Sequence, residues 1–157
     1  MKKQIVIGTK NPAKVAQINH ALSEVGIKLP SLVDFVVEQV EIVEDGQTAM
    51  ENARKKALGY AKHLKLPVLA TDNALFFDSK DFLPGHWLFA ICIVTPDEKL
   101  FETTLESPRT FVCRPSQQKI SGYPLESLQV DPGSGKYISE MSTKERLLTP
   151  FTVPPLA

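Results

Sequence analysis

The first half of the chain alternates between short apolar runs and segments with helical spacing. An apolar run at 4–8 predicts a strand. From 12 to about 25 apolar residues recur every three to four positions, which predicts a helix, and Gly26 ends it. The stretch 35–42, in which apolar residues stand among polar neighbours, predicts a second strand.

A longer helix is predicted from Thr48 to about Leu64. Thr48 and Glu51 have the spacing of a capping box, and apolar or small residues follow at helical spacing. The run 67–71 then predicts a strand that ends just before Asp72. The order is βαβαβ, which favours an α/β sheet with ligands at its strand ends.

From Trp87 onward the pattern changes to strands joined by turns. The run 87–94 predicts a buried strand, and its return partner is expected at 100–105 after a turn. A third strand is expected at 110–113, and a short helix at about 143–148. Residues 149–157 contain three prolines and predict an irregular tail.

Composition limits the possible classes of function. A chain of 157 residues with 43% apolar and 23% charged residues is expected to form one domain. Its net charge is zero, which argues against a nucleic acid polymer as partner. Cys92 and Cys113 show no metal-ligand spacing and are expected to be buried free thiols. No signal peptide or membrane span is recognised, so we expect a cytoplasmic protein.

The loop Gly8–Lys14 between the first strand and helix is the strongest candidate for chemistry. Asn11 or Thr9 can cap the helix, and Pro12 suits its first position. Helix N-termini attract phosphate, and Lys14 adds a full charge one turn further on. The spacing is neither that of a Walker loop nor that of a dinucleotide-binding turn. An ordinary helix start with a solvated lysine is the alternative.

Two further groups of residues are expected at the same edge of the sheet. Glu44, with Glu41 as a second candidate, precedes the long helix, and Lys56 lies two turns into that helix. Asp72 follows the strand 67–71. Carboxylates beside lysines favour a Mg²⁺–phosphate site. Taken singly, Glu44 could be a turn residue, Lys56 a solvated side chain and Asp72 a turn former, while Glu51 reads most simply as a cap.

These motifs together resemble the inosine/xanthosine triphosphate pyrophosphatases. Residues 9–14 are similar to that family's Thr/Ser-x-Asn-x-x-Lys signature, and 44–57 to its Glu-x-Gly-x-Thr-Phe-x-Glu-Asn-Ala segment with the following Lys-Ala. Residues 67–75 are similar to its Ala-Asp-Asp-Ser-Gly-Leu strand end. The resemblance is specific for residues 1–85.

The resemblance implies Mg²⁺-dependent hydrolysis of a nucleoside triphosphate to the monophosphate and pyrophosphate. Thr9, Asn11 and Lys14 would hold phosphates, and Lys56 would neutralise developing charge. Glu44 would hold Mg²⁺. Asp72 would be the base, the group that orients water, or a second metal ligand. Deaminated purines, as in ITP, dITP or XTP, are the implied substrates, and a homodimer is the implied assembly.

The departures from the family pattern fall mainly in the second half. Thr71 stands where the family has the first of two aspartates, and the long helical segment expected after Gly85 is missing. The base-recognition stretch is echoed only at 122–125, and the closing Ser-His-Arg has no match at 149–151. The phosphate and metal residues are therefore mostly kept, while the residues that read the purine are mostly gone.

The expected protein is a single α/β domain with a mixed twisted sheet and flanking helices. It would comprise a phosphate and metal lobe at 1–85, a shortened second lobe at 86–148 and the tail. A nucleotide- or phosphate-binding protein without turnover is the alternative function, and the replacement of an acid by Thr71 favours it. An enzyme for another nucleotide, such as a pyrimidine or a modified base, would share the mechanism.

Overall fold

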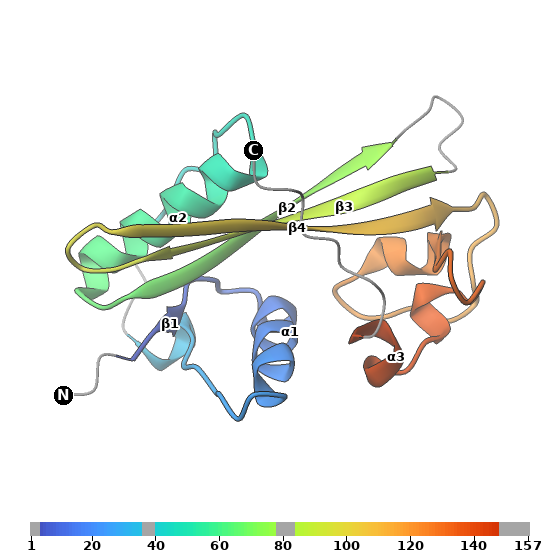
Figure 1. Ribbon diagram of the computed structural model, residues 1–157, viewed down its shortest axis with the longest axis horizontal. Coiled ribbons are helices and arrows are strands. Elements are labelled where there is room, and N and C mark those ends of the chain that lie inside the picture. The colour runs from blue at the N-terminus through green and yellow to red at the C-terminus, as the bar shows by residue number, and fades with distance from the viewer. Residues whose placement is uncertain (1–3, 36–39, 78–83, 148–157) are drawn as a thin grey trace. The chain divides into compact units, whose positions relative to one another are not determined.

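One mixed sheet organises the chain (Figure 1). The computed structural model describes residues 4–35, 40–77 and 84–147. The strands follow one another in the order β1-β2-β3-β4-β5: β1 Val6–Ile7, β2 Val68–Phe77, β3 Pro84–Val94, β4 Leu100–Phe111 and β5 Gln129–Val130. β1 pairs in parallel with β2, whereas β5 pairs antiparallel with β4. The expected mixed α/β sheet with flanking helices is confirmed.

The chain divides into two compact units. The first joins Met1–Asn73 to Phe89–Thr104, and the second joins Ala74–Leu88 to Leu105–Ala157. Each unit therefore consists of two separate pieces of the chain. The single domain with lobes at 1–85 and 86–148 stays a prediction.

Helix α1, Pro12–Ser23, begins directly after Asn11, as the sequence of the opening loop predicts. Asn11 is the N-cap, and its side-chain oxygen accepts hydrogen bonds from the main-chain N–H groups of Ala13 and Lys14. Gly26 closes the turn after the helix with a φ of 69°, a conformation that favours glycine. No residue of α1 is buried, so the helix depends strongly on its cap.

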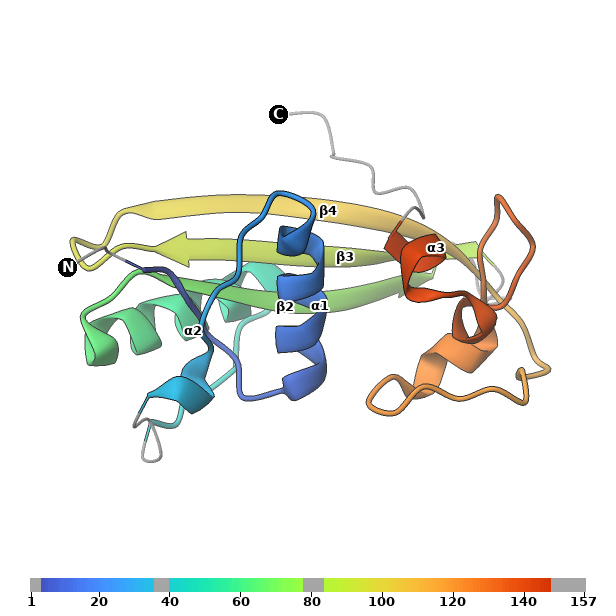
Figure 2. The same cartoon turned by 90° about the horizontal axis from the view of Figure 1, so that it is seen from below.

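Helix α2, Ala49–Leu64, lies on the opposite side of this unit's strands from α1 (Figures 1 and 2). The Thr48 hydroxyl accepts a hydrogen bond from the Glu51 N–H at 3.1 Å. Glu51 accepts from the Gln47 N–H rather than from Thr48, so the expected capping box is only half formed. The buried face of α2 consists of Ala49, Ala53, Lys56, Ala57, Tyr60 and Ala61.

The strand expected at 35–42 is wrong for the residues that are described. Phe35 and 40–42 belong to no strand, and 36–39 lie outside the described residues. A Cβ added at Gly59 would lie 2.2 Å from the Ile42 side chain. Ile42, at the end of the expected strand, therefore packs against α2. Before this segment, η1 (Leu32–Asp34) forms a single 3₁₀ turn.

Two strands are longer than the sequence indicates. β2 continues through Asp72 to Phe77, so Asp72 lies within a strand and not directly after one. β4 ends with Thr110 and Phe111, and Val112 and Cys113 belong to no strand, so the separate third strand expected at 110–113 is wrong. Polar residues lie inside both elements, and β4 also contains Pro108, although prolines usually interrupt strands.

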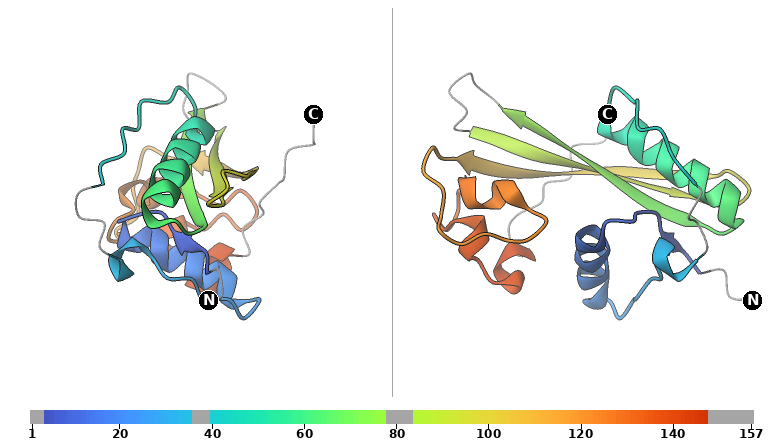
Figure 3. Two further views of the ribbon diagram at one scale, coloured as in Figure 1. Left: turned by 90° about the vertical axis from the view of Figure 1, so that its left-hand side faces the viewer. Right: turned by 180° about the vertical axis from the view of Figure 1, so that it is seen from behind.

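The described residues of the second unit contain three short helical turns, η2 (Pro124–Leu128), η3 (Ile138–Glu140) and α3 (Thr143–Leu147), which gather near the end of β4 (Figure 3). The Trp87 indole donates to the Gln129 side chain at 2.8 Å, and the Phe77 ring packs edge-on against Phe111. The helix expected at 143–148 is confirmed as far as Leu147. Residue 148 and the tail at 149–157 lie outside the described residues.

The two cysteines differ. Cys92 is buried, as expected, and burial together with the Glu102 carboxylate raises the pKa of its thiol to about 11. Cys113 is exposed, so the expectation that it is buried is wrong. In the described residues no helix has both the length and the apolar character that crossing a membrane requires.

Candidate active site

Lys56 joins two carboxylates that come from different parts of the first unit. Its ammonium lies 2.9 Å from Glu44 Oε2, in the segment before α2, and 2.9 Å from Asp72 Oδ1, in β2. The Lys56 side chain is 9% exposed, Asp72 is 18% exposed and Glu44 is 48% exposed. A buried lysine is thus paired with two acids that remain accessible from solvent.

Contacts with α2 on both sides position Glu44. Ile42 packs into the space that Gly59 leaves open. Beyond Glu44, the Gly46 N–H donates to the Asn52 side-chain oxygen at 2.8 Å. Glu44 therefore lies in a segment outside any helix or strand, and this segment contacts α2 both before and after Glu44.

Lys14 brings a second positive charge from α1 to the same place. Partial burial lowers the pKa of its ammonium, and the charge of Lys56 lowers it further, while Asp72 and Glu44 oppose that shift. We call Lys14, Glu44, Lys56 and Asp72 the acid–lysine cluster. Of the opening-loop residues singled out in the sequence, Lys14 joins Glu44, Lys56 and Asp72, whereas the hydrogen bonds of Thr9 and Asn11 stay within the loop and the start of α1.

The opening loop differs in detail from the expected phosphate cradle. Asn11 occupies the N–H groups of Ala13 and Lys14, and Pro12 has none, so the first turn of α1 offers few free donors. The Thr9 hydroxyl accepts from the Asn11 N–H at 3.2 Å. Phosphate would therefore meet side chains and the helix dipole more than free N–H groups of the helix.

Other acids of the same segments do not take part in this cluster. Glu51 accepts from the Gln47 N–H, which agrees with its simplest interpretation as a capping residue. Asp45 pairs with Lys55 on the surface, and that pair lowers the pKa of its carboxyl. Glu41 is exposed.

Tyr60 and Asn52 are neighbours of the cluster that sequence reasoning did not assign to the site. Burial raises the pKa of the Tyr60 phenol, and the Glu44 charge raises it further. Asn52 lies one helical turn before Lys56, and its amide N–H₂ donates to Asp72 Oδ2 at 3.4 Å. The i, i+4 spacing of Asn52 and Lys56 was the available signal, because it puts both on one face of α2.

The donor set of the cluster fits a divalent cation that arrives with phosphate. Mg²⁺ is usually held by one or two carboxylates plus substrate phosphate oxygens. Glu44 and Asp72 supply two carboxylates. Across 4–35, 40–77 and 84–147, no group of three or more His, Cys, Asp or Glu side chains could hold a metal ion alone.

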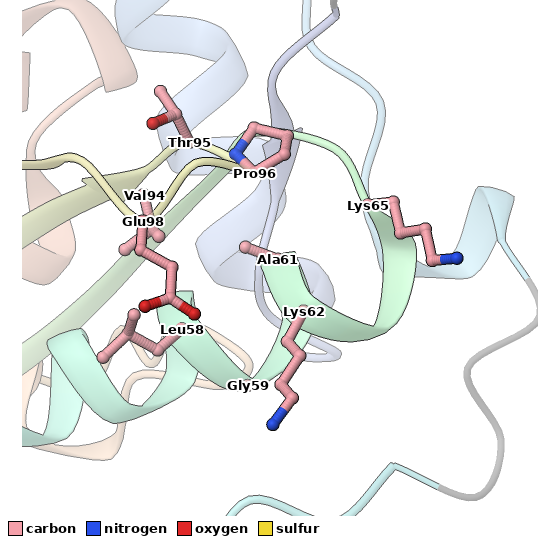
Figure 4. Close-up of a pocket in the computed structure, with 9 residues that line it drawn as sticks. All are labelled: Leu58, Gly59, Ala61, Lys62, Lys65, Val94, Thr95, Pro96 and Glu98. Atoms are coloured by element: carbon pink, nitrogen blue, oxygen red, sulfur yellow. The ribbon is translucent and has the colours of Figure 1, made fainter.

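A surface hollow of about 340 Å³ lies elsewhere in the first unit (Figure 4). The end of α2 and the turn between β3 and β4 form its walls, with Leu58 and Pro96 on the apolar side and Lys62 and Glu98 as charged residues. None of the four residues of the acid–lysine cluster lines it. Its volume therefore does not bear on the site.

The chain is an α/β protein whose mixed sheet and helices carry the acid–lysine cluster. The model of the Ham1 family matches residues 5–114, and the chain belongs to that family. This confirms the family that the three sequence motifs indicated.

Two similar curated relatives carry the same name. A "dITP/XTP pyrophosphatase" from Halalkalibacterium halodurans is 39% identical over 84 residues, which cover 53% of this chain and 42% of the relative. A protein of the same name from Rhodopseudomonas palustris is 24% identical over 91% of this chain and 84% of its own length. In the first match the chain thus spans less than half the length of its relative.

Solved structures support the fold. A Ham1 protein from Coxiella burnetii superposes with a TM-score of 0.76 at 19% identity, over 93% of this chain and 90% of the other. At this identity the likeness shows the fold alone.

Proposed function

We propose that this chain hydrolyses a nucleoside triphosphate to the monophosphate and pyrophosphate with Mg²⁺ as cofactor. The observation that carries the proposal is the Lys56 ammonium, which lies 2.9 Å from both Glu44 and Asp72. Membership of the Ham1 family and the names of its relatives support it.

Phosphoryl chemistry depends mainly on positioning and charge compensation, which the cluster supplies. Thr9, Asn11 and Lys14 would hold phosphate oxygens. Lys56 would leave its carboxylate partners and neutralise charge that develops on the phosphates.

The two acids divide the remaining roles. Glu44 would hold Mg²⁺, and Asp72 would be a second ligand or accept the proton of the attacking water. When bound, Mg²⁺ neutralises phosphate charge and makes bound water more acidic. Asp72 is 18% exposed, so water reaches its carboxylate.

The substrates we propose are nucleotides of deaminated purines, ITP, dITP or XTP. The names of the relatives support this choice. A cytoplasmic homodimer completes the proposal. Leu100 and Phe101, exposed by 44% and 59%, offer apolar surface that a second copy could cover.

Pyrophosphate release from a panel of nucleoside triphosphates in Mg²⁺ tests the activity. We expect turnover with ITP, dITP or XTP, and a fall of about 10²- to 10⁴-fold in kcat for Asp72→Asn, as for loss of an acid–base group. Glu44→Gln should lose most activity and need more Mg²⁺. Glu102→Gln is the control, because this acid pairs with Arg54 outside the cluster. Equal activity in Asp72→Asn and Glu102→Gln would contradict the proposal.

Binding without turnover is the second candidate, and Thr71 is the observation that favours it. Where the resemblance leads us to expect a pair of aspartates, this chain has only Asp72. Tight binding of Mg²⁺ and a triphosphate without release of pyrophosphate would favour this alternative.

A further inference from the structure

Asn52 connects the two carboxylate-bearing segments of the acid–lysine cluster. Its side-chain oxygen accepts from the Gly46 N–H at 2.8 Å, two residues after Glu44. Its N–H₂ group donates to Asp72 Oδ2 at 3.4 Å. One half-buried side chain of α2 thus contacts both the segment before the helix and strand β2.

The chemistry of the two partners fixes the orientation of this amide. A main-chain N–H can only donate, and an ionised carboxylate can only accept. Turning the amide over would set donor against donor at Gly46 and acceptor against acceptor at Asp72. An ionised aspartate at position 52 could serve Gly46 but not Asp72, so the asparagine amide meets a requirement that a carboxylate does not.

The contact with Gly46 is close enough to exclude a side chain there. A Cβ added at Gly46 would lie 2.6 Å from Asn52 Oδ1 and 2.8 Å from the Glu51 Cβ. Together with the packing of Ile42 on Gly59, this contact holds Glu44 between two attachments to α2.

Asp72 is held at both of its oxygens. Oδ1 accepts from Lys56 at 2.9 Å, and Oδ2 accepts from Asn52 at 3.4 Å. If Lys56 turns to the phosphates, Asn52 is the contact that keeps the carboxylate from rotating.

We propose that Asn52 is a positioning residue that holds Glu44 and Asp72 at the spacing at which they share a divalent cation. The inference rests on the proposed function, and it assigns Asn52 no contact with substrate. Groups that orient metal ligands in this way typically change metal affinity by about 10- to 100-fold when they are removed.

The test compares Asn52→Ala with Asn19→Ala in the full chain. Asn19 is a matched control, because it also makes two hydrogen bonds through its amide, to the N–H and the carbonyl of Leu29. Electron paramagnetic resonance would measure Mn²⁺ affinity in the presence of inosine α,β-imidotriphosphate. We expect affinity to fall about 10- to 100-fold in Asn52→Ala and to change less than about twofold in Asn19→Ala.

Two further measurements separate positioning from stability. Hydrogen exchange at the Gly46 amide should accelerate in Asn52→Ala and not in Asn19→Ala, while thermal melts report the loss of stability in each variant. Asn52→Gln keeps the amide but is one methylene longer, so it should also lose Mn²⁺ affinity. This variant decides the question if Asn52→Ala does not fold.

The outcomes distinguish this inference from the proposed function. Wild-type affinity in Asn52→Gln, or equal affinity in the two alanine variants, would overturn the role of Asn52 alone. A wild-type chain that binds Mn²⁺ with the analogue but releases no pyrophosphate from any triphosphate would overturn hydrolysis and leave the binding comparison valid. A wild-type chain that binds no Mn²⁺ would overturn both.

Discussion

Lys56 is a buried cation between two acids, and this placement has a consequence for metal binding. Its ammonium contacts Glu44 Oε2 and Asp72 Oδ1, which are oxygens that a divalent cation would use. Two lysines and two acids give the acid–lysine cluster no net formal charge. A bare cation must therefore displace Lys56, whereas a triphosphate gives Lys56 and Lys14 new partners and frees the acids. Metal and nucleotide should consequently bind with positive coupling.

Lys56→Met tests this exchange, because it removes the charge and keeps a long side chain. Without nucleotide, we expect Mn²⁺ to bind about tenfold more tightly than to wild type, equivalent to about 1.4 kcal/mol. Triphosphate affinity should fall at the same time, because a phosphate partner is lost. Calorimetric titration of each ligand alone measures both changes.

Lys56→Arg keeps the charge and serves as the control for that variant. It should bind Mn²⁺ alone as weakly as wild type does. If Lys56→Met binds Mn²⁺ no better than Lys56→Arg, the ammonium does not compete with the cation.

Among the elements, α1 depends most on its cap. It has no buried residue, and Asn11 holds the N–H groups of Ala13 and Lys14. Asn11→Ala should cost about 1 kcal/mol, which corresponds to a melting temperature lower by about 2–4 °C in a chain of this size. Thermal denaturation followed by circular dichroism measures this shift.

Asn11→Asp separates the cap from the proposed phosphate contact. Aspartate caps helices about as well as asparagine, so the melting temperature should stay near that of wild type. Its negative charge should nevertheless weaken triphosphate binding. Unchanged triphosphate affinity in Asn11→Asp would argue against a phosphate beside this residue.

The elements that could be predicted from the sequence are those with local signals. Asn11 with Pro12, and Thr48 with the helical spacing after it, mark the starts of α1 and α2 within a residue. The strand expected at 35–42 is absent at Phe35 and at 40–42, where Ile42 packs instead on Gly59 of α2, a contact between residues distant in the sequence. The true end of β2 was missed because Asp72 and Asn73 read as turn formers.

The charged residues of the candidate site could be picked out from the sequence, because their order in the chain relative to the expected strands and helices was known. Lys14, Glu44, Lys56 and Asp72 meet as the sequence led us to expect, although the expectation placed Asp72 at the end of a strand and the structure places it inside β2. Asn52 was not singled out, because its i, i+4 spacing from Lys56 puts the two on one face of α2 but does not show what that face contacts. Only the fold shows that Asp72 lies inside a strand and takes hydrogen bonds from two residues of α2.

At the scale of the whole molecule, the two cysteines report on different units. Cys92 lies in the first unit and has no exposed surface, while Cys113 lies in the second unit and is exposed. The pKa of Cys92 is raised to about 11, so the folded state favours its thiol. The protonated Cys92 thiol therefore contributes stability to the folded state that is fully present below the ordinary thiol pKa. This stability is lost as the pH rises through about 11.

Thiol labelling with a disulfide reagent at pH 8 should therefore show one fast and one protected cysteine. Cys113→Ser should remove the fast phase, and Cys92→Ser should leave it intact.

A ligand present at 100 times its Kd stabilises the native state by about 2.7 kcal/mol. Mn²⁺ with inosine α,β-imidotriphosphate should thus slow Cys92 labelling about 100-fold where labelling requires unfolding. Cys113 is exposed in the native state, so its rate should not change, and slowing at both thiols would mean that the ligand also covers the second unit.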